Sequence, residues 1–359
     1  MTEDAYNFDA RLAHAATPPA SWYTDARVLD IEQRKVFGRT WQLVGRTEQV
    51  REAGQFFTAT VADEPVIVAR GLDGRLRAFS NVCRHRAGPV AEGAGRRRSF
   101  RCGYHGWTYA LDGRLLVTPE FEGVECWNRD AHALPEFRVD VWGALVFVNL
   151  DAEAAPLAAT LEDLPERVGH RNDWDEMRPA ARKEWHVACN WKTYVDNYLE
   201  GYHIPVVHPG LARELDYRRY RTETRRLYSI QHAPVRRERA TRIAAGEGED
   251  AAQYFWVFPN LMLNVYPDNY STNLIVPLAP ERTLTVFEWY FKDAERADVR
   301  EAVRRTVEFS DEIQVEDIQI CEAVQRGLRS RTYTSGRYSV ARENGVHHFH
   351  GLLAHYLAD

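Results

Sequence analysis

Two short stretches decide the fold of this 359-residue chain: NVCRHRAG at residues 81–88 and CGYHGW at residues 102–107. Each stretch holds one cysteine and one histidine, and sixteen residues separate the two pairs. The chain has only five cysteines, an odd number, so we expect metal ligands or buried thiols and no disulfide framework. The four candidate ligands are Cys83, His85, Cys102 and His105.

The composition is that of a soluble globular protein, with 45% hydrophobic and 27% charged residues. A net charge of −6 gives no indication of nucleic-acid binding. No apolar run reaches the length of a membrane span, and the longest, VWGALVFVNL at residues 141–150, predicts one buried strand. The acidic first residues, MTEDAYNFDA, do not resemble a secretory signal, so we expect a cytoplasmic location.

The order of the four ligands distinguishes between two kinds of metal site. Zinc takes two cysteines and two histidines, but common zinc fingers pair like with like along the sequence. Here the residue types alternate, which suits a cluster whose two irons differ, with both cysteines on one and both histidines on the other. CRHRAG and CGYHGW thus resemble the two ligand loops of a Rieske domain, which implies a [2Fe–2S] cluster. A structural zinc site is the alternative.

The sequence around these loops predicts a small antiparallel β domain over residues 39–151. Asp-Gly between apolar runs is typical of β-hairpins. The pair occurs at Asp73–Gly74, within QFFTATVADEPVIVARGLDGRLRAFSNVC, and again at Asp112–Gly113, within WTYALDGRLLV. We therefore expect both metal-binding loops to lie on a β scaffold.

A second set of candidate ligands follows in NWKTYVDNYLEGYHIPVVHPG, residues 190–210. Spacings of three predict that Asn197, Glu200 and His203 share one face of a helix. Pro205 disfavours helix at the residue before it, so we expect the helix to end near His203. His208 then comes from the following turn, and both histidines can converge on one metal. Singly, either histidine could instead be a core residue.

Two histidines and one carboxylate form the facial triad of non-haem iron oxygenases, which leaves positions open for O2. The third ligand is expected on the amphipathic helix predicted for Glu308–Leu328. Periodicity leaves its candidate carboxylates equivalent. Any one of them, taken singly, could be a surface residue. They are Asp311, Glu312, Glu316 and Asp317.

The second motif resembles that of the Rieske non-haem iron oxygenases, in their terminal oxygenase (alpha) subunits. The resemblance implies His203, His208 and Asp317 as iron ligands. It assigns Glu200 a bridging role between His203 and His105 of a neighbouring subunit, although the family more often has Asp there. It also implies an α+β fold: the antiparallel Rieske domain is inserted into a helix-grip (START-like) catalytic domain formed by residues 1–38 and 152–359.

Other expectations concern the catalytic domain. The runs YFWVFPNLMLNVYPD, STNLIVPLAP and RTLTVFEWYF predict an antiparallel sheet, with the Asp317 helix packed across it. Residues 242–253 are expected to form a loop over the active site. A histidine cluster in GVHHFHGLL is expected to serve packing. It comprises His347, His348 and His350.

The family's chemistry sets the expected partners. No G-x-G-x-x-G nucleotide motif occurs, so NAD(P)H would act only through a separate reductase or ferredoxin. The resemblance implies a homotrimer that hydroxylates (monooxygenates) a small substrate. The C-terminal third is similar to the choline monooxygenase-like, quaternary-amine branch, whose substrate could be caged by Phe287, Trp289 and Phe291 unless these rings serve sheet packing.

Three alternatives stay open at this point. One is an oxygenase that hydroxylates the ring, or removes an O-methyl group, of an aromatic acid. Another is a Rieske electron-transfer protein with a degenerate catalytic domain. The last is a zinc-stabilised ligand carrier of helix-grip fold.

Overall fold

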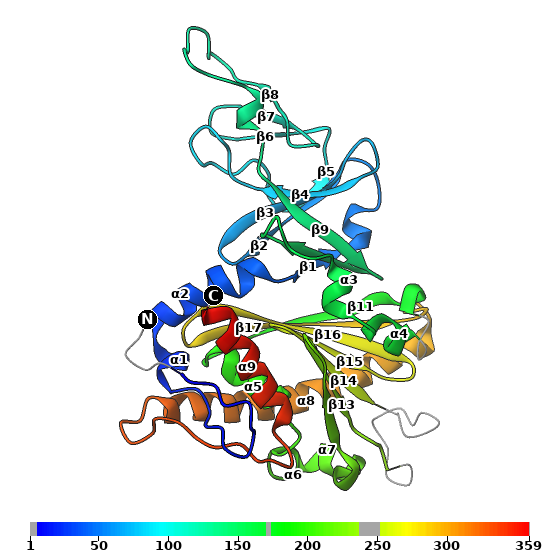
Figure 1. Ribbon diagram of the computed structural model, residues 1–359. Helices are drawn as coiled ribbons and strands as arrows, with labels where there is room; N and C mark the ends of the chain where they lie inside the picture. The colour runs from blue at the N-terminus through cyan, green and yellow to red at the C-terminus, as the bar shows by residue number, and fades with distance from the viewer. Residues whose placement is uncertain (1–5, 170–173, 237–251, 359) are drawn as a thin grey trace. The chain divides into compact units, whose positions relative to one another are not determined.

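The computed structural model describes residues 6–169, 174–236 and 252–358. Most of the loop expected at residues 242–253 lies outside these ranges. The chain divides into two compact units, one formed by residues 37–159 and the other by residues 1–36 with 160–359 (Figure 1). The smaller unit is thus inserted into the sequence of the larger one.

The smaller unit is the antiparallel β structure that the hairpin signals predict. A seven-stranded sheet has the order β1-β10-β9-β4-β3-β2-β5, and a second sheet has the order β6-β7-β8. Gly74 and Gly113 occupy the expected turns with φ of +77° and +86°, a region that favours glycine. The strands are β1 Gln42–Arg46, β2 Gln55–Val61, β3 Glu64–Arg70, β4 Leu76–Ser80, β5 Ala94–Arg96, β6 Ser99–Arg101, β7 Thr108–Ala110, β8 Leu115–Val117, β9 Glu136–Trp142 and β10 Leu145–Asn149.

The apolar run at residues 141–150 is not the single buried strand that was expected. The chain reverses at Gly143, whose φ is +55°, and Leu145 pairs with Trp142 in the resulting hairpin. All of β10 is buried, whereas β9 is only partly so. A continuous apolar run therefore conceals a hairpin, because glycine lets the backbone turn without a break in hydrophobicity.

The larger unit is built on a seven-stranded antiparallel sheet of order β11-β17-β16-β15-β14-β13-β12. Helix α8 packs against β11 and β17, and α5 contacts both α8 and β16 (Figure 1). The strands are β11 Arg178–Val187, β12 Arg221–Thr224, β13 Tyr228–His232, β14 Gln253–Val257, β15 Leu261–Val265, β16 Asn269–Ala279 and β17 Arg282–Phe291. The helices of the chain are α1 Ser21–Thr24, α2 Ala26–Lys35, α3 Leu157–Leu161, α4 Leu164–Gly169, α5 Trp191–Tyr198, α6 Ile204–Val207, α7 Pro209–Glu214, α8 Ala297–Leu328 and α9 Asn344–Ala358.

Helix α8 begins eleven residues before the predicted helix, and its buried face is more polar than expected. Gln314, Cys321 and Gln325 are its buried residues, whereas the apolar Val324 is 44% exposed. Gln314 donates to Thr285 Oγ1 at 3.1 Å, and Gln325 accepts from the backbone of Asn190 at 2.9 Å. The two amides are tolerated in the interior because each is hydrogen-bonded there.

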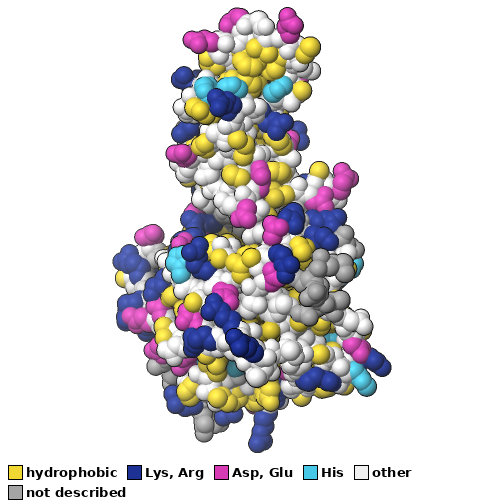
Figure 2. Space-filling view, turned by 90° about the vertical axis from the view of Figure 1, so that its left-hand side faces the viewer, with side chains coloured by type: hydrophobic (Ala, Val, Ile, Leu, Met, Phe, Trp, Pro, Cys, Tyr) yellow, Lys and Arg dark blue, Asp and Glu magenta, His cyan; other side chains and the backbone are white. Residues whose placement is uncertain are grey.

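The described surface mixes charges of both signs. On the face shown in Figure 2, Lys and Arg side chains are interspersed with Asp and Glu side chains over the larger unit. None of the helices within the described residues has the length and hydrophobicity that spanning a membrane requires.

A buried ion pair fixes α5, the helix that leads into the second metal site. Lys192 Nζ lies 2.7 Å from Glu32 Oε1, and both side chains are fully buried. Trp191 Nε1 donates to the other carboxylate oxygen at 2.8 Å. Burial raises the pKa of Glu32 and lowers the pKa of Lys192, and their mutual attraction opposes both shifts.

We predict that Lys192→Met lowers the free energy of unfolding by about 3–5 kcal/mol, because it leaves the Glu32 carboxylate buried without its cation. Chemical denaturation followed by circular dichroism measures the change. The double variant Glu32→Gln/Lys192→Met should lose less than the sum of the two single variants. A single variant within about 0.5 kcal/mol of the parent would contradict the assignment.

Candidate metal centres

Cys83, His85, Cys102 and His105 lie on two tight loops of the smaller unit. The first loop follows β4, and its Cys83 N–H donates to the Gly88 carbonyl at 2.8 Å. The second connects β6 to β7, where the Cys102 N–H donates to the Trp107 carbonyl at 2.9 Å. Gly106 has a φ of +75°, the left-handed conformation that this turn requires.

The two histidines lie close to each other, and so do the two cysteines. The rings of His85 and His105 are 4.6 Å apart between centroids, and both cysteines are 3% exposed. Burial, together with the neighbouring Cys83, raises the pKa of the Cys102 thiol. The buried Nδ1 of His85 has no hydrogen-bond partner among the described residues. An unpartnered imidazole nitrogen, in a loop that also carries a buried thiol, fits a metal-bound state, since buried polar atoms normally have partners.

Tyr109 reaches this group from β7. Its hydroxyl lies 3.3 Å from Cys83 Sγ and accepts a hydrogen bond from the backbone of Arg84 at 2.9 Å. Burial raises the pKa of Tyr109, so the hydroxyl keeps its proton. Toward a metal-bound thiolate it can only donate.

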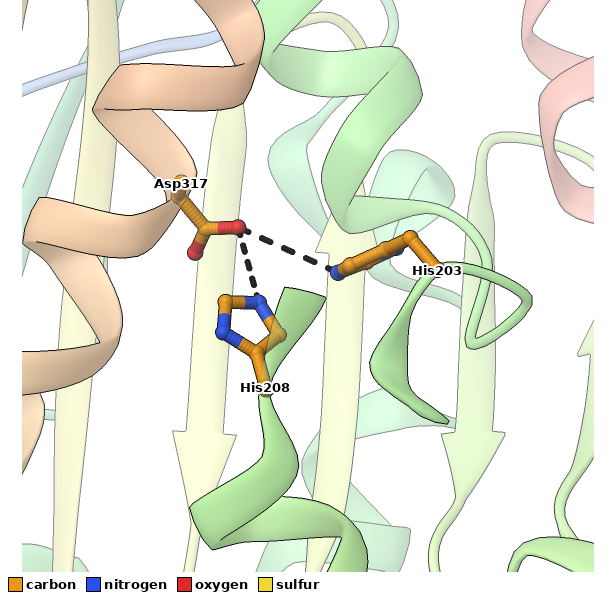
Figure 3. A group of neighbouring side chains, drawn as sticks. All are labelled: His203, His208 and Asp317. Carbon is orange, nitrogen blue, oxygen red and sulfur yellow. Dashed lines mark hydrogen bonds and ion pairs between the residues drawn. The ribbon is translucent and has the colours of Figure 1, made fainter. Parts of the chain in front are cut away.

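A second group forms in the larger unit from three separate segments. His203 precedes α6, His208 lies between α6 and α7, and Asp317 comes from α8 (Figure 3). Their ligand atoms all lie within 4.8 Å of one another. Asp317 Oδ1 is 3.0 Å from His208 Nε2 and 3.8 Å from His203 Nε2. Two imidazole nitrogens and a carboxylate oxygen in this arrangement are the donor set of a non-haem iron site.

The expected helix through His203 ends earlier than predicted. Helix α5 stops at Tyr198, so Glu200 and His203 lie in a turn and not on one helix face. Gly201 lies in this turn, where a Cβ would come within 2.7 Å of the Tyr220 ring. The Glu200 carboxylate accepts from the backbone N–H groups of Tyr202 and His203, which stabilises the turn.

Two carboxylates hold the histidines from their other ring nitrogens. Glu200 Oε1 lies 2.6 Å from His203 Nδ1, and Glu316 Oε2 lies 2.7 Å from His208 Nδ1. Each carboxylate accepts a hydrogen bond from Nδ1–H, which keeps the proton on Nδ1 and leaves Nε2 to bind a metal. Burial disfavours the charged form of His208, but contacts with Asp317 and Glu316 outweigh it and raise its pKa.

The four carboxylates that periodicity left equivalent have distinct environments. Asp317 is next to both histidines, Glu316 contacts only His208, and Asp311 pairs with Lys183. The sequence indicated Glu316 only as a candidate metal ligand and did not predict its contact with His208 Nδ1. Asn197 was also missed: its Nδ2 donates to Asp317 Oδ1 at 2.6 Å. The only feature of the sequence that indicated a role for Asn197 was its spacing of three residues from Glu200.

The side chains of His203, His208 and Asp317 line one end of a cavity of about 340 Å³. One wall is a stripe along α8 from Ala302 to Asp317, and another is the face of the sheet that bears Phe287 and Trp289. Phe291, the third aromatic residue considered in the sequence, is buried but does not line this cavity. Further lining comes from tyrosines and amides, namely Tyr194, Tyr198, Tyr220, Tyr254, Tyr266, Asn264, Asn273 and Gln231.

The C-terminal histidine cluster belongs to the packing of α9, as expected. His350 forms hydrogen bonds with the hydroxyl groups of Tyr23 and Tyr338, at 2.9 and 2.7 Å. His347 Nε2 lies 2.8 Å from the backbone carbonyl of Asp9.

Comparison with known proteins defines the class. Residues 40–128 match the Rieske [2Fe-2S] domain family. Residues 174–359 match the family described as ring hydroxylating alpha subunit (catalytic domain). The chain therefore belongs to the Rieske non-haem iron oxygenases and has the fold of their alpha subunits.

Several relatives share nearly the full length of the chain. It is 38% identical to a chloroplastic choline monooxygenase of Arabidopsis thaliana, over 96% of this chain and 84% of that protein. It is 32% identical to the carnitine monooxygenase oxygenase subunit of Escherichia coli K12, over 98% and 97% of the two chains.

Solved structures agree with this placement. The quaternary ammonium Rieske monooxygenase CntA in complex with L-carnitine has a TM-score of 0.83 at 29% identity, over 97% of each chain. Naphthalene 1,2-dioxygenase from a Rhodococcus species, at 18% identity and a TM-score of 0.78 over 95% and 93% of the chains, shares the fold.

We predict that Tyr109→Phe lowers the reduction potential of the Rieske centre, because the lost hydrogen bond stabilises the more negative, reduced state. A bond worth about 1 kcal/mol corresponds to roughly 40 mV for one electron. Redox titration followed by electron paramagnetic resonance measures the shift. Tyr104→Phe, which alters an exposed hydroxyl in the second loop, is the control. An unchanged potential in Tyr109→Phe would exclude the proposed hydrogen bond.

Proposed function

We propose that this protein is the terminal oxygenase of a system that monooxygenates a small quaternary ammonium compound. One observation carries the proposal: the group of His203, His208 and Asp317 opens into an aromatic-lined cavity of about 340 Å³. The choline and carnitine monooxygenases among its relatives support the substrate class.

The proposed ligand assignments follow the geometry of the two sites. Cys83, Cys102, His85 and His105 would hold the [2Fe–2S] cluster in a Rieske domain of residues 39–151. The catalytic domain, residues 1–38 and 152–359, would bind iron through His203, His208 and Asp317. When bound, the cluster stores and supplies electrons singly, and the iron offers open positions for O2 beside the substrate.

Neighbouring side chains position the proposed iron ligands. Glu200 and Glu316 fix the tautomer and orientation of the two histidines from Nδ1. Asn197 holds one oxygen of Asp317 by donating to it. The ligand atoms are thus oriented by the chain itself, which lowers the reorganisation needed for metal binding.

The cavity suits a cation better than an aromatic acid. Its described lining includes the carboxylates of Glu200, Asp268 and Asp317, while the only arginine among those described residues, Arg305, is exposed. Phe287 and Trp289 present rings with centroids 6.0 Å apart, and aromatic faces attract alkylammonium groups. A buried carboxylate substrate would meet repulsion here and would lack a buried cation.

The electron source and the assembly form part of the same proposal. A separate reductase, a ferredoxin or both would pass electrons from NAD(P)H to the Rieske domain. A homotrimer would place Glu200 between His203 and His105 of a neighbouring subunit. The work on CntA that describes inter-subunit electron transfer supports this arrangement by analogy. Glu200 would then act catalytically as the bridge between the metal sites. The cytoplasmic location stays a prediction from the sequence.

The proposed function is tested by O2 uptake with a surrogate reductase across quaternary amines and aromatic acids. We expect stimulation by at least one quaternary amine, with product containing oxygen from 18O2. Uptake stimulated only by aromatic acids would overturn the substrate class. A colourless, zinc-containing protein without oxygenase activity would overturn the whole proposal.

We predict that His208→Ala retains the cluster absorption but loses turnover, because it removes one of the three iron ligands. Metal analysis should fall from about three irons per chain to about two, with two sulfides retained. His14→Ala, a change of an exposed histidine, is the matched control and should keep all three. Parent-like product formation by His208→Ala would refute the assignment.

We predict that Glu316→Ala weakens iron binding about 10- to 100-fold, because His208 loses the acceptor that fixes its tautomer. Competition with an iron chelator measures the affinity, and the cluster spectrum reports whether the fold is intact. Glu312→Ala alters an exposed carboxylate on the same helix and should leave the affinity unchanged. Equal chelator sensitivity in all three proteins would remove the positioning role of Glu316.

A further inference from the structure

One amide in the catalytic cavity lacks the partners that its neighbours have. Asn273, on β16, lines the cavity and is only 5% exposed. Its Oδ1 is buried without a hydrogen-bond partner among the described residues. Buried polar groups in native proteins are nearly always hydrogen-bonded, so this amide needs a partner other than the described residues.

Two other amides in the same cavity, Asn264 and Gln231, are already engaged. Asn264 donates to Ser271 Oγ and accepts from Tyr198 Oη, both at 3.0 Å. Gln231 accepts from Tyr220 Oη at 2.7 Å and donates to the Tyr198 carbonyl at 2.5 Å. The lack of a partner is therefore specific to Asn273 among these three amides.

Strand register places Asn273 between the metal end of the cavity and its aromatic wall. Asn273 pairs with Phe287 on β17, and two residues earlier Thr285 accepts a hydrogen bond from Gln314. Gln314 lies one turn of α8 from Asp317. Thr285 and Phe287 are on the same face of the sheet, about 7 Å apart along the strand. A small molecule that reaches the metal ligands can therefore also reach Asn273.

We infer that Asn273 binds a hydroxyl group of the substrate, and that the preferred substrate is a hydroxyl-bearing quaternary ammonium cation of the choline type. This inference rests on the proposed function. The free amide offers a donor and an acceptor, and a hydroxyl group satisfies both. The ammonium group then lies toward Phe287 and Trp289, where ring faces attract it.

A carboxylate at the same position fits less well. A carboxylate only accepts hydrogen bonds, so the amide oxygen would stay unpartnered and face a negative charge. The cavity's described arginine, Arg305, precedes Asp317 by twelve residues on α8, a rise of about 18 Å. Substrates whose second charged group is a carboxylate are therefore expected to bind more weakly.

The test compares three probes on the full-length protein with both metals bound. They are choline, propyltrimethylammonium, which lacks the hydroxyl group, and γ-butyrobetaine, which carries a carboxylate. Calorimetry gives the dissociation constants, and O2 uptake gives kcat/KM. We expect the parent protein to favour choline over propyltrimethylammonium about 10- to 100-fold, because the buried amide is left unpartnered by the latter. Preference for γ-butyrobetaine over choline would overturn the inference.

Asn273→Leu supplies the second measurement, since it removes both hydrogen-bonding groups at similar volume. It should weaken choline binding about 10- to 100-fold and change propyltrimethylammonium binding less than about threefold. Asn264→Leu is the matched control: it removes an amide that already has partners, so the ratio between the two probes should not change. An equal loss for both probes in Asn273→Leu would overturn the inference.

The outcomes separate this inference from the proposed function. If quaternary amines stimulate O2 uptake with no preference for a hydroxyl group, the function stands and the role of Asn273 fails. If no quaternary amine binds or reacts, both fail. Should Asn273→Leu not fold, the preference of the parent protein among the three probes still decides the role of the amide.

Discussion

The catalytic unit depends on bringing two imidazoles and one carboxylate within bonding range of a single cation. His203 and His208 are close in sequence, but Asp317 lies more than a hundred residues further on. Their ligand atoms lie within 4.8 Å of one another only because α8 packs across the sheet and beside α5. Each ligand is held by a further side chain, which fixes its direction before any metal binds.

The interior that supports this site contains several buried polar and charged side chains. Gln314 and Gln325 anchor α8 through hydrogen bonds, and the buried pair of Glu32 and Lys192 anchors α5. Such contacts specify geometry more strictly than apolar packing, because a small displacement leaves a buried group without a partner. This supports a site whose ligands come from separate segments and must meet with little freedom.

Local signals in the sequence predicted the parts of the structure that depend on local spacing. The alternating cysteines and histidines indicated the cluster loops, and the Asp-Gly pairs indicated the hairpins around them. The continuous run at residues 141–150 concealed a hairpin, because hydrophobicity does not record a turn at Gly143. The turn after Tyr198 was also missed, since periodicity does not record the hydrogen bonds from the Tyr202 and His203 backbone to Glu200 that stabilise it.

Long-range contacts were beyond the sequence alone. Periodicity left four carboxylates on α8 equivalent, and only the family resemblance selected Asp317. The contact of Glu316 with His208 depends on how α8 packs against a distant loop. The sequence did not indicate a binding role for Asn273, because a single amide in a buried strand belongs to no motif. Only the structure shows that its oxygen has no partner among the described residues.

The proposed function needs two kinds of iron site in one polypeptide. Diffraction data collected on both sides of the iron and zinc absorption edges test this most directly. We predict an elongated iron peak between the loops of Cys83 and Cys102, and a single iron peak bounded by His203, His208 and Asp317. Anomalous signal from zinc at the first position, or side chains that point apart at the second, would contradict the account.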